Sequence, residues 1–224
     1  MSREEIKKTG TFYTVIEGTF RTRVDETDED AERREWSTPD GKTGVKWERV
    51  IGALVGKIEG IAFYESDYGK NLQITLAKDD PTDKTRIISL GTASNYGEDT
   101  MKKLPNVNLT KEIRFRPFCF TAEDTGKEVR GMELTQQDEQ GKFTKKVTNY
   151  FWNVEKKEAR HGYPTPEGDV QAYSSDDWKI FYLQARKFLI QNTIEQVISK
   201  VSTTGNTEPP ADYPVDEDAL HPAF

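Results

Sequence analysis

The sequence predicts a mainly β fold in which a small closed barrel has an N-terminal strand extension and is followed by a C-terminal α-helix. Three observations predict this class. Several short segments rich in Thr, Val, Ile and aromatic residues alternate between polar and apolar positions, and glycines interrupt the longest of them. One segment near the C-terminus instead carries its apolar residues at helical spacing. The chain has 224 residues, which is long enough to bury a substantial core.

The first 44 residues are predicted to form strands and an acidic loop that pack on the barrel. The stretch "TFYTVIEGTFRTRV" (11–24) is typical of one or two strands. The acidic connection from Asp25 to Glu35 holds seven acids and two arginines, and "STPDGKTG" then reads as a turn because of its Pro, Asp and Gly content.

A long first barrel strand is expected in "VKWERVIGALVGKIEGIAFY" (45–64). Gly52, Gly56 and Gly60 interrupt it, and glycines inside a strand often mark a bulge or a coil that lets a sheet curl. The segments "NLQITLA" and "TRIISLG" follow as two further strands, each after a turn.

A short helix is expected within "TASNYGEDTMKKLPNVNL", and Pro105 ends it because the residue before a proline is pushed out of the α region. Strand patterns return in "KEIRFRPFCFTA", "KEVRGMELTQQ" and "KKVTNYFWNV", with Pro117 indicating an edge or a bulge. Three strands, a short helix and two or three further strands are the element order of the OB-fold, a small closed barrel.

The C-terminal third predicts a helix near 177–200, in which Ile190, Ile194, Val197 and Val201 recur at helical spacing after possible Ser and Asp caps. We therefore expect an OB-fold core with this helix over 45–202. Residues 203–224 have the composition of a disordered linker and an acidic tail.

The formal net charge of −7 does not exclude a nucleic-acid partner, because the acids are concentrated. The connection from Asp25 to Glu35 carries −5, and the segment from Glu208 to Phe224 carries another −5, which leaves the rest of the chain mildly basic. The potential that matters for binding is local, because salt screens charges beyond about 10 Å.

Basic and aromatic residues interleave in the predicted barrel. In "EIRFRPFCF" the strand period places Ile113, Phe115 and Cys119 on one face and two arginines with two phenylalanines on the other. Cations for phosphates and flat rings for base stacking are what a single-strand groove needs. The candidate DNA-binding residues are Arg21, Arg23, Lys46, Trp47, Tyr64, Tyr68, Lys70, Arg86, Arg114, Arg116, Phe118, Phe120, Tyr150 and Trp152.

The sequence contains few residue patterns that are typical of catalysis, so we expect no enzyme, no metal site and no cofactor. Gly41-Lys42-Thr43 matches only the end of a phosphate-binding loop, and the acidic stretch has Arg33 where a calcium loop needs glycine. His161 lacks a metal-ligand pattern, and Cys119 in an apolar strand reads as a small buried hydrophobe. Converged carboxylates that form a metal-dependent nuclease stay an alternative.

The chain ends in "DYPVDEDALHPAF", an acidic string with a terminal aromatic. A disordered tail gains no stability from Phe224, so the ring is expected to enter a surface that a partner supplies. No apolar run is long enough to span a membrane, the N-terminus lacks a signal peptide, and a single cysteine fits a reducing compartment. These features predict a cytoplasmic protein.

The barrel stretch from about 45 to 155, including "YESDYGKNLQITL" and "KKLPNVNL", together with "PVDEDALHPAF", resembles the single-stranded DNA-binding proteins of bacteriophages. The resemblance implies an OB-fold core and an acidic tail that docks on replication and recombination proteins. On that basis Asp216, Glu217 and Asp218 would meet basic residues of the partner, and Phe224 would enter an apolar pocket. The bacterial pattern ends in Pro-Phe, whereas Ala223 intervenes here.

The resemblance implies a protein that coats and protects single-stranded DNA with little sequence preference and recruits partners in replication, recombination or repair, in the host cytoplasm if a phage encodes it. A single-strand annealing or recombination-mediator protein is the alternative within binding functions. The sequence leaves open the oligomeric state, the footprint and the choice between DNA and RNA.

Overall fold

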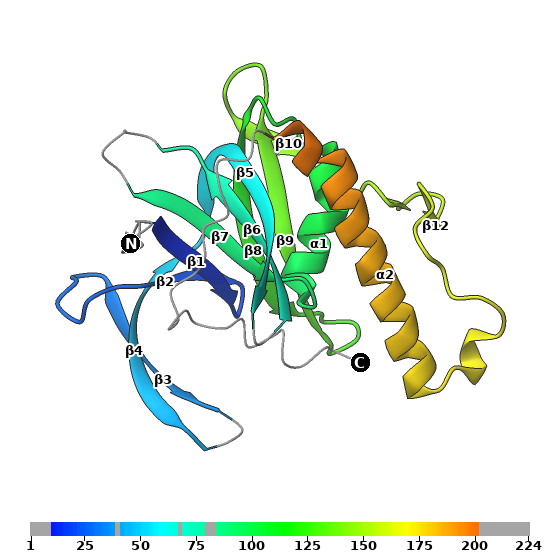
Figure 1. The fold of residues 1–224 in the computed structure, drawn as a ribbon, viewed down its shortest axis with the longest axis horizontal. Coiled ribbons are helices and arrows are strands. Elements are labelled where there is room, and N and C mark those ends of the chain that lie inside the picture. Colours follow the sequence, from blue (N-terminus) through cyan, green and yellow to red (C-terminus); the bar gives the residue numbers. More distant parts are fainter. Residues whose placement is uncertain (1–9, 39–40, 67–68, 79–83, 202–224) are drawn as a thin grey trace, which may run out of the picture.

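A computed structural model describes residues 10–38, 41–66, 69–78 and 84–201. Within these residues the chain is mainly β, and ten of its strands form one mixed sheet in the order β10-β9-β8-β5-β6-β7-β1-β2-β4-β3 (Figure 1). The strands are β1 (Gly10–Ile16), β2 (Thr19–Arg23), β3 (Ala31–Ser37), β4 (Thr43–Ile51), β5 (Leu54–Ser66), β6 (Gly69–Leu76), β7 (Thr85–Gly91), β8 (Glu112–Thr121), β9 (Glu128–Gln137), β10 (Phe143–Lys146), β11 (Trp152–Asn153) and β12 (Glu158–Ala159). The helices are α1 (Asn95–Lys103), α2 (Ser175–Gln196) and the short 3₁₀ segments η1 (Leu104–Asn106), η2 (Val170–Ala172) and η3 (Ile198–Lys200).

The central strand of the sheet is β5, which pairs with β6 on one side and with β8 on the other. A register shift between Ile58 and Gly60 bends it. A Cβ atom at Gly56 would lie 3.2 Å from the Cβ atom of Leu76, so the small residue lets the coiled strand approach its neighbour closely. The single strand expected over 45–64 is wrong, because the ladder breaks after Ile51 and divides this stretch into β4 and β5.

The sheet curls until the turn between β1 and β2 contacts β8. Gly18 has a φ of +77° in this turn, and a Cβ atom there would lie only 2.5 Å from the backbone nitrogen of Cys119. The Gly18 amide also donates a hydrogen bond of 2.9 Å to the buried hydroxyl of Tyr96 on α1. Within the described residues no ladder joins β2 to β8 or β3 to β10, so the sheet is not closed and the closed barrel remains a prediction.

The position of Pro117 in β8 fits the end of the ladder between β5 and β8. The last residue of β8 that pairs with β5 is Phe115, so Pro117 lies where β8 has β9 as its only ladder partner. Proline has no N–H to donate and is tolerated at such an edge. This is the edge position that the sequence predicted for Pro117.

Apolar side chains on the inner face of the curled sheet form the core together with one side of each helix. The core includes Phe20, Ile61, Leu72, Ile74, Leu76, Ile88, Leu90, Tyr96, Met101, Phe115, Leu134, Phe151 and Leu189. Ser94 caps α1 by accepting a hydrogen bond from the Gly97 amide. At the other end Lys103 donates to the Met132 carbonyl oxygen, which fixes α1 on β9. The α-helix ends at Lys103 and Pro105 lies in η1, as the sequence predicts.

The acidic connection is shorter than the sequence predicts. Residues from Ala31 to Ser37 form β3, which pairs with β4 over seven residue pairs. The sequence does not reveal this strand, because most of its residues are charged and it lacks the alternation of apolar with polar residues that predicts a half-buried strand. Figure 1 shows the β3–β4 hairpin extending from the body of the molecule as an arm.

The C-terminal helix is present but begins and ends earlier than predicted. In α2, Ser174 and Asp177 form a capping box, with the Ser174 amide donating to the Asp177 carboxylate at 2.8 Å. The helix ends at Gln196 and continues into η3. Its buried residues are Ala185, Leu189 and Thr193, so only the second half packs on the core. No helix in the described ranges is long and apolar enough to cross a membrane.

The last predicted strand is largely absent. In "KKVTNYFWNV" the residues Lys145 and Lys146 end β10, whereas Trp152 and Asn153 belong to the separate two-stranded sheet β11–β12. Between them, the Tyr150 amide donates to the Lys102 carbonyl oxygen and ties the chain to α1.

Candidate nucleic-acid interface

The outer face of β8 carries alternating arginine and phenylalanine side chains. Ile113, Phe115 and Pro117 are buried, so the intervening residues point away from the core. These residues are Arg114, Arg116, Phe118 and Phe120, which we call the β8 surface.

The two phenylalanine rings of the β8 surface lie side by side. The ring centroids of Phe118 and Phe120 are 5.8 Å apart with an angle of 33° between the planes, and 53% of Phe120 is exposed. Phe118 faces Gly131 on β9, where a Cβ atom would lie 2.6 Å from the ring. The missing side chain therefore makes room for the ring against the strand.

The arginines of the β8 surface are held in different ways. The Arg114 guanidinium lies 5.7 Å from the ring centroid of Phe143 on β10, and its Nε atom donates to the Thr135 hydroxyl at 3.1 Å. Arg116 is exposed and lies opposite Glu133, which forms an ion pair with Lys146 at 3.5 Å. One arginine is thus fixed and the other can reach toward a phosphate.

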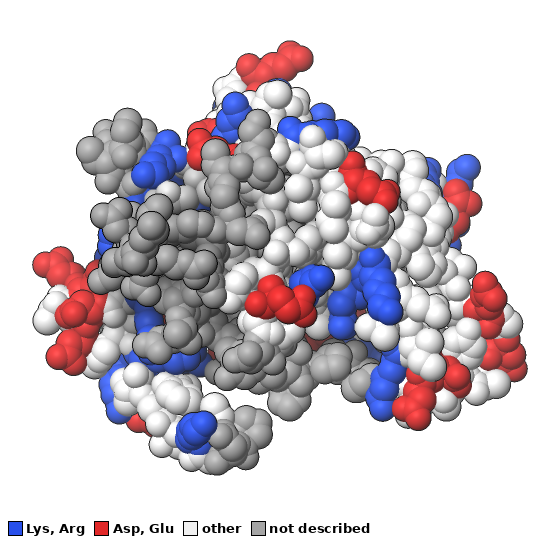
Figure 2. Space-filling model, viewed as in Figure 1, with Lys and Arg blue, Asp and Glu red and all other residues white. Residues whose placement is uncertain are grey.

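A second basic surface lies on the arm and β2. Cross-strand partners share a face of the sheet, and the pairs Arg23–Glu48, Glu48–Glu32 and Arg34–Lys46 place these side chains together. We call the residues Arg21, Arg23, Arg34, Trp36 and Lys46 the arm surface. Figure 2 shows Lys and Arg side chains on the hairpin and at its junction with the body, beside the acids of the preceding connection.

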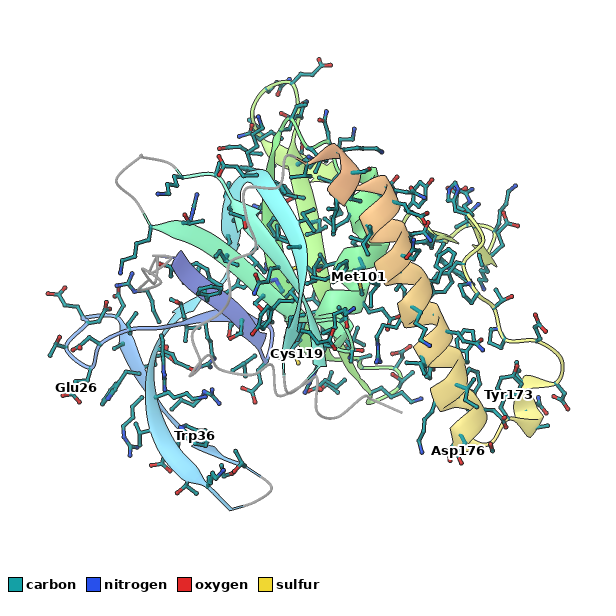
Figure 3. All side chains as sticks on the ribbon, in the orientation of Figure 1. Glu26, Trp36, Met101, Cys119, Tyr173 and Asp176 are labelled. Atoms are coloured by element: carbon teal, nitrogen blue, oxygen red, sulfur yellow. The ribbon has the colours of Figure 1, made fainter. Side chains whose placement is uncertain are left out.

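A buried carboxylate organises the arm surface. Glu48 is fully buried, and its Oε2 atom lies 2.8 Å from Nε of Arg34 and 3.5 Å from Nη1 of Arg21. Two guanidinium groups share one carboxylate, which leaves a net positive charge. The Lys46 ammonium lies 5.1 Å from the ring centroid of Trp36. That ring, labelled in Figure 3, packs over Gly44, where a Cβ atom would lie 2.7 Å away.

The curl of the sheet brings the turn that precedes β2 against the backbone of β8. The turn at Gly18 contacts the backbone of Phe118 and Cys119, and β2 starts directly after this turn. Figure 3 shows Cys119 close to the end of β1. Thr19, Arg21 and Arg23 alternate on the outer face of β2, so this strand carries two arginines between the turn beside β8 and the arm.

Several predicted residues lie away from these surfaces. Trp47 points to the opposite face of β4 from Lys46, since adjacent strand residues alternate. Tyr64 lies near the end of β5, opposite Asn71. The Lys70 ammonium forms an ion pair with Glu65 at 3.5 Å.

Three more candidates are at other places in the fold. Arg86 lies on the inner side of β7 and donates to the Ala77 carbonyl oxygen at 2.9 Å. The Tyr150 ring stacks on His161 at 3.9 Å beside α1, and Trp152 is exposed on the separate β11–β12 sheet. Tyr68 and the tail residues Asp216, Glu217, Asp218 and Phe224 lie outside the described residues.

Sequence reasoning missed Arg34, Trp36 and Phe143. The first two are two residues apart in "AERREWS", a spacing that places them on one face of a strand. The acidic residues around them made the stretch resemble a loop, so the strand spacing was not recognised. Phe143 follows a glycine turn in a short edge strand, and only the pairing of β10 with β9 brings it near Arg114.

A cavity of about 740 Å³ lies between α1 and α2 and is lined by Glu98, Asp99, Lys102, Arg130, Lys179 and Arg186, among others. Both lining carboxylates are paired with lysines of α1: Glu98 contacts Lys102, and Asp99 lies 2.7 Å from the Lys103 ammonium. Burial acts to lower the pKa of Lys102, but the Glu98 carboxylate and the Tyr163 hydroxyl outweigh it and raise that pKa. Lysine 102 is therefore a cation at neutral pH.

Two observations concern metal ligands and the cysteine in the described part of the chain. No cluster of three His, Cys, Asp or Glu side chains suited to a metal ion occurs among those residues. Burial and a hydrogen bond to Glu128 raise the pKa of the half-buried Cys119 thiol, so it stays protonated at neutral pH.

Comparisons of the chain with protein-family models, curated proteins and solved structures gave no match. The β8 surface and the arm surface are therefore the features from which a function can be inferred.

Proposed function

We propose that this protein binds single-stranded nucleic acid, preferentially DNA, with little sequence preference along the path from the β8 surface to the arm surface. The observation that carries the proposal is the outer face of β8, where two adjacent phenylalanine rings alternate with two arginines. A partly exposed aromatic pair leaves apolar ring surface in contact with water, whereas bases stack on such rings at about 1–3 kcal/mol per base.

The aromatic and the basic residues have different roles in the proposed binding. Phe118 and Phe120 offer faces on which any base can stack, which gives affinity without sequence readout. Arg114 and Arg116 supply charge for the phosphates beside those rings, and Arg23 and Lys46 extend that charge along β2 and the arm. No step of this binding requires a metal or a cofactor.

The same proposal includes an OB-type barrel as the scaffold. The strands β5, β6 and β7, then α1, then β8 and β9 follow the element order of that fold, and the sheet curls about a coiled β5. The N-terminal strand β1 pairs in parallel with β7, and its following turn fills the space beside β8. The resemblance of the sequence to bacteriophage single-stranded DNA-binding proteins supports this assignment.

We further propose that the acidic segment ending at Phe224 recruits replication or recombination proteins. Its charge of −5 and terminal aromatic support a docking role. Because its carboxylates resemble phosphates in charge, the segment should also compete with DNA for the basic path.

The test is fluorescence anisotropy of a labelled oligo(dT), titrated with the full chain and with a chain ending at Thr207, at several salt concentrations. We expect log K to fall with log salt at about 0.7 per phosphate neutralised, and the shortened chain to bind more tightly. Absence of binding by both proteins would refute the proposal.

Two variants with matched controls locate the site. Phe120→Ala should weaken binding by about 1–3 kcal/mol, while Trp152→Ala, which removes an exposed aromatic from the other sheet, should not. Arg116→Ala should lower the salt slope by about one phosphate, while Arg160→Ala, an exposed arginine beside β12, should leave it unchanged.

Incubation with labelled strands and magnesium separates the other functions. Cleavage of the strand would indicate a nuclease, and duplex formation from complementary strands would indicate an annealing protein. We expect neither, since the proposal assigns only binding to this surface.

A further inference from the structure

The first half of α2 exposes an apolar face that nothing in the described chain covers. Ala185 and Leu189 face the core, whereas Ile180 and Leu183 are 56% and 47% exposed, and Leu183 also lines the cavity between α1 and α2. Figure 1 shows this end of α2 extending past the sheet. A helix that is apolar on both sides is normally buried on both sides in an assembly.

The exposed face has a specific order of residues. Asp176, Ile180, Leu183 and Lys187 follow one another at steps of four, three and four residues, so they form one row along the helix. All four are exposed. Asp176, labelled at the free end of the helix in Figure 3, also forms an ion pair with Lys179 of its own helix at 3.0 Å, which the pairing with a second copy would share. We call this row the α2 stripe.

The order of residues in the α2 stripe is symmetric about its midpoint, so that two stripes lying antiparallel would be complementary. Its midpoint falls between Phe181 and Tyr182, with the isoleucine and the leucine equally far from it on either side. The aspartate and the lysine are likewise equally far from it, with opposite charges. A two-fold axis through this midpoint would therefore place each residue of one stripe opposite a suitable residue of the other.

We propose that the α2 stripe pairs antiparallel with the same stripe of a second copy of this chain, forming a two-fold symmetric dimer. In each half of the interface Ile180 packs on Leu183 of the other copy, and the Asp176 carboxylate meets the Lys187 ammonium. A parallel arrangement would place like charges opposite each other. The pairing does not depend on nucleic-acid binding.

Charge complementarity is the argument for a second copy rather than another protein. The stripe carries the acid at one end and the base at the other, which suits an isologous contact. The core of each copy lies on the other side of its helix, at Ala185 and Leu189, so the two bodies point apart. One helix pair buries an area at the low end of specific interfaces, below about 1,200 Å², so we expect a dissociation constant on the order of micromolar.

The apolar part of the proposal is tested by sedimentation velocity of the full chain over a range of concentrations. We expect a monomer–dimer equilibrium for the native sequence and at least a tenfold higher dissociation constant for Ile180→Glu and Leu183→Glu. The control is Val154→Glu, at a 74% exposed valine outside the stripe, which should dimerise like the native chain.

The orientation is tested by charge reversal. Asp176→Lys alone and Lys187→Asp alone should each weaken the dimer, because each creates two like-charge contacts. The double variant D176K/K187D should restore it, while Lys145→Asp on β10 should have no effect. Circular dichroism should show the same helix content in all of them.

Three outcomes would overturn the proposal. A chain that stays monomeric at every concentration would show that a second copy does not cover the face. A dimer insensitive to the glutamate variants would lie elsewhere on the molecule, and a double variant that fails to restore the dimer would exclude the antiparallel register.

Discussion

Replacing Gly18 with alanine should weaken the contact that curls the sheet. The residue has a φ of +77°, where an L side chain is strained by about 1–2 kcal/mol. Its Cβ atom would also lie 2.5 Å from the Cys119 nitrogen and 2.9 Å from the Phe118 carbonyl carbon. Backbone atoms cannot rotate away as a side chain can, so the turn has to move from β8 by several tenths of an ångström or more.

The size of the effect follows from adding these two causes. Overpacking in a well-packed region costs about 1–3 kcal/mol, so Gly18→Ala should lower the free energy of unfolding by about 2–5 kcal/mol. Gly141 provides a matched control, because its φ is also +77° and a Cβ atom there would meet nothing within 4 Å. Gly141→Ala should therefore cost only the backbone strain.

The assay is urea unfolding followed by tryptophan fluorescence and circular dichroism, together with oligo(dT) binding of the folded variants. The difference between the two variants isolates the clash with β8. If Gly18→Ala were no more destabilising than Gly141→Ala, the turn would not pack on β8 and the continuous basic path would be refuted. If the turn does pack there, the Gly18 variant should also bind the oligonucleotide more weakly.

Three further predictions concern buried and capping groups. Glu48→Gln should destabilise the arm by about 3 kcal/mol, measured by urea unfolding, because it leaves two guanidinium groups without their carboxylate, yet it should steepen the salt dependence of DNA binding. Tyr96→Phe should cost about 1–3 kcal/mol in the same unfolding assay, since it removes the acceptor of the Gly18 amide. Hydrogen bonds from the Ser174 hydroxyl and amide lower the pKa of Asp177, so the cap should stabilise α2 above the unfolded value of 3.8 and be lost as the pH falls through the lower folded pKa. An NMR titration of the Asp177 carboxyl should show this shift, and Ser174→Ala should reduce it, because the variant loses the hydroxyl but keeps the backbone amide.

The sequence by itself determined the mainly β class, the two α-helices and the alternating faces of β8. These are local properties, because a period of two or 3.6 residues and a proline such as Pro105 act on neighbours along the chain. The alternation of Arg114, Phe115 and Arg116 was enough to separate a core face from an outer face before any fold was known.

The tertiary structure decided which of these local features meet. Arg34 and Trp36 became part of a basic surface only through their pairing with β4. The end of β8 and the start of β2 are about 100 residues apart in sequence, and they meet because Gly18 lets a turn approach the strand. Such contacts depend on how far the sheet curls. The curl results from the packing of side chains from many strands on the inner face, so no single segment of the sequence determines it.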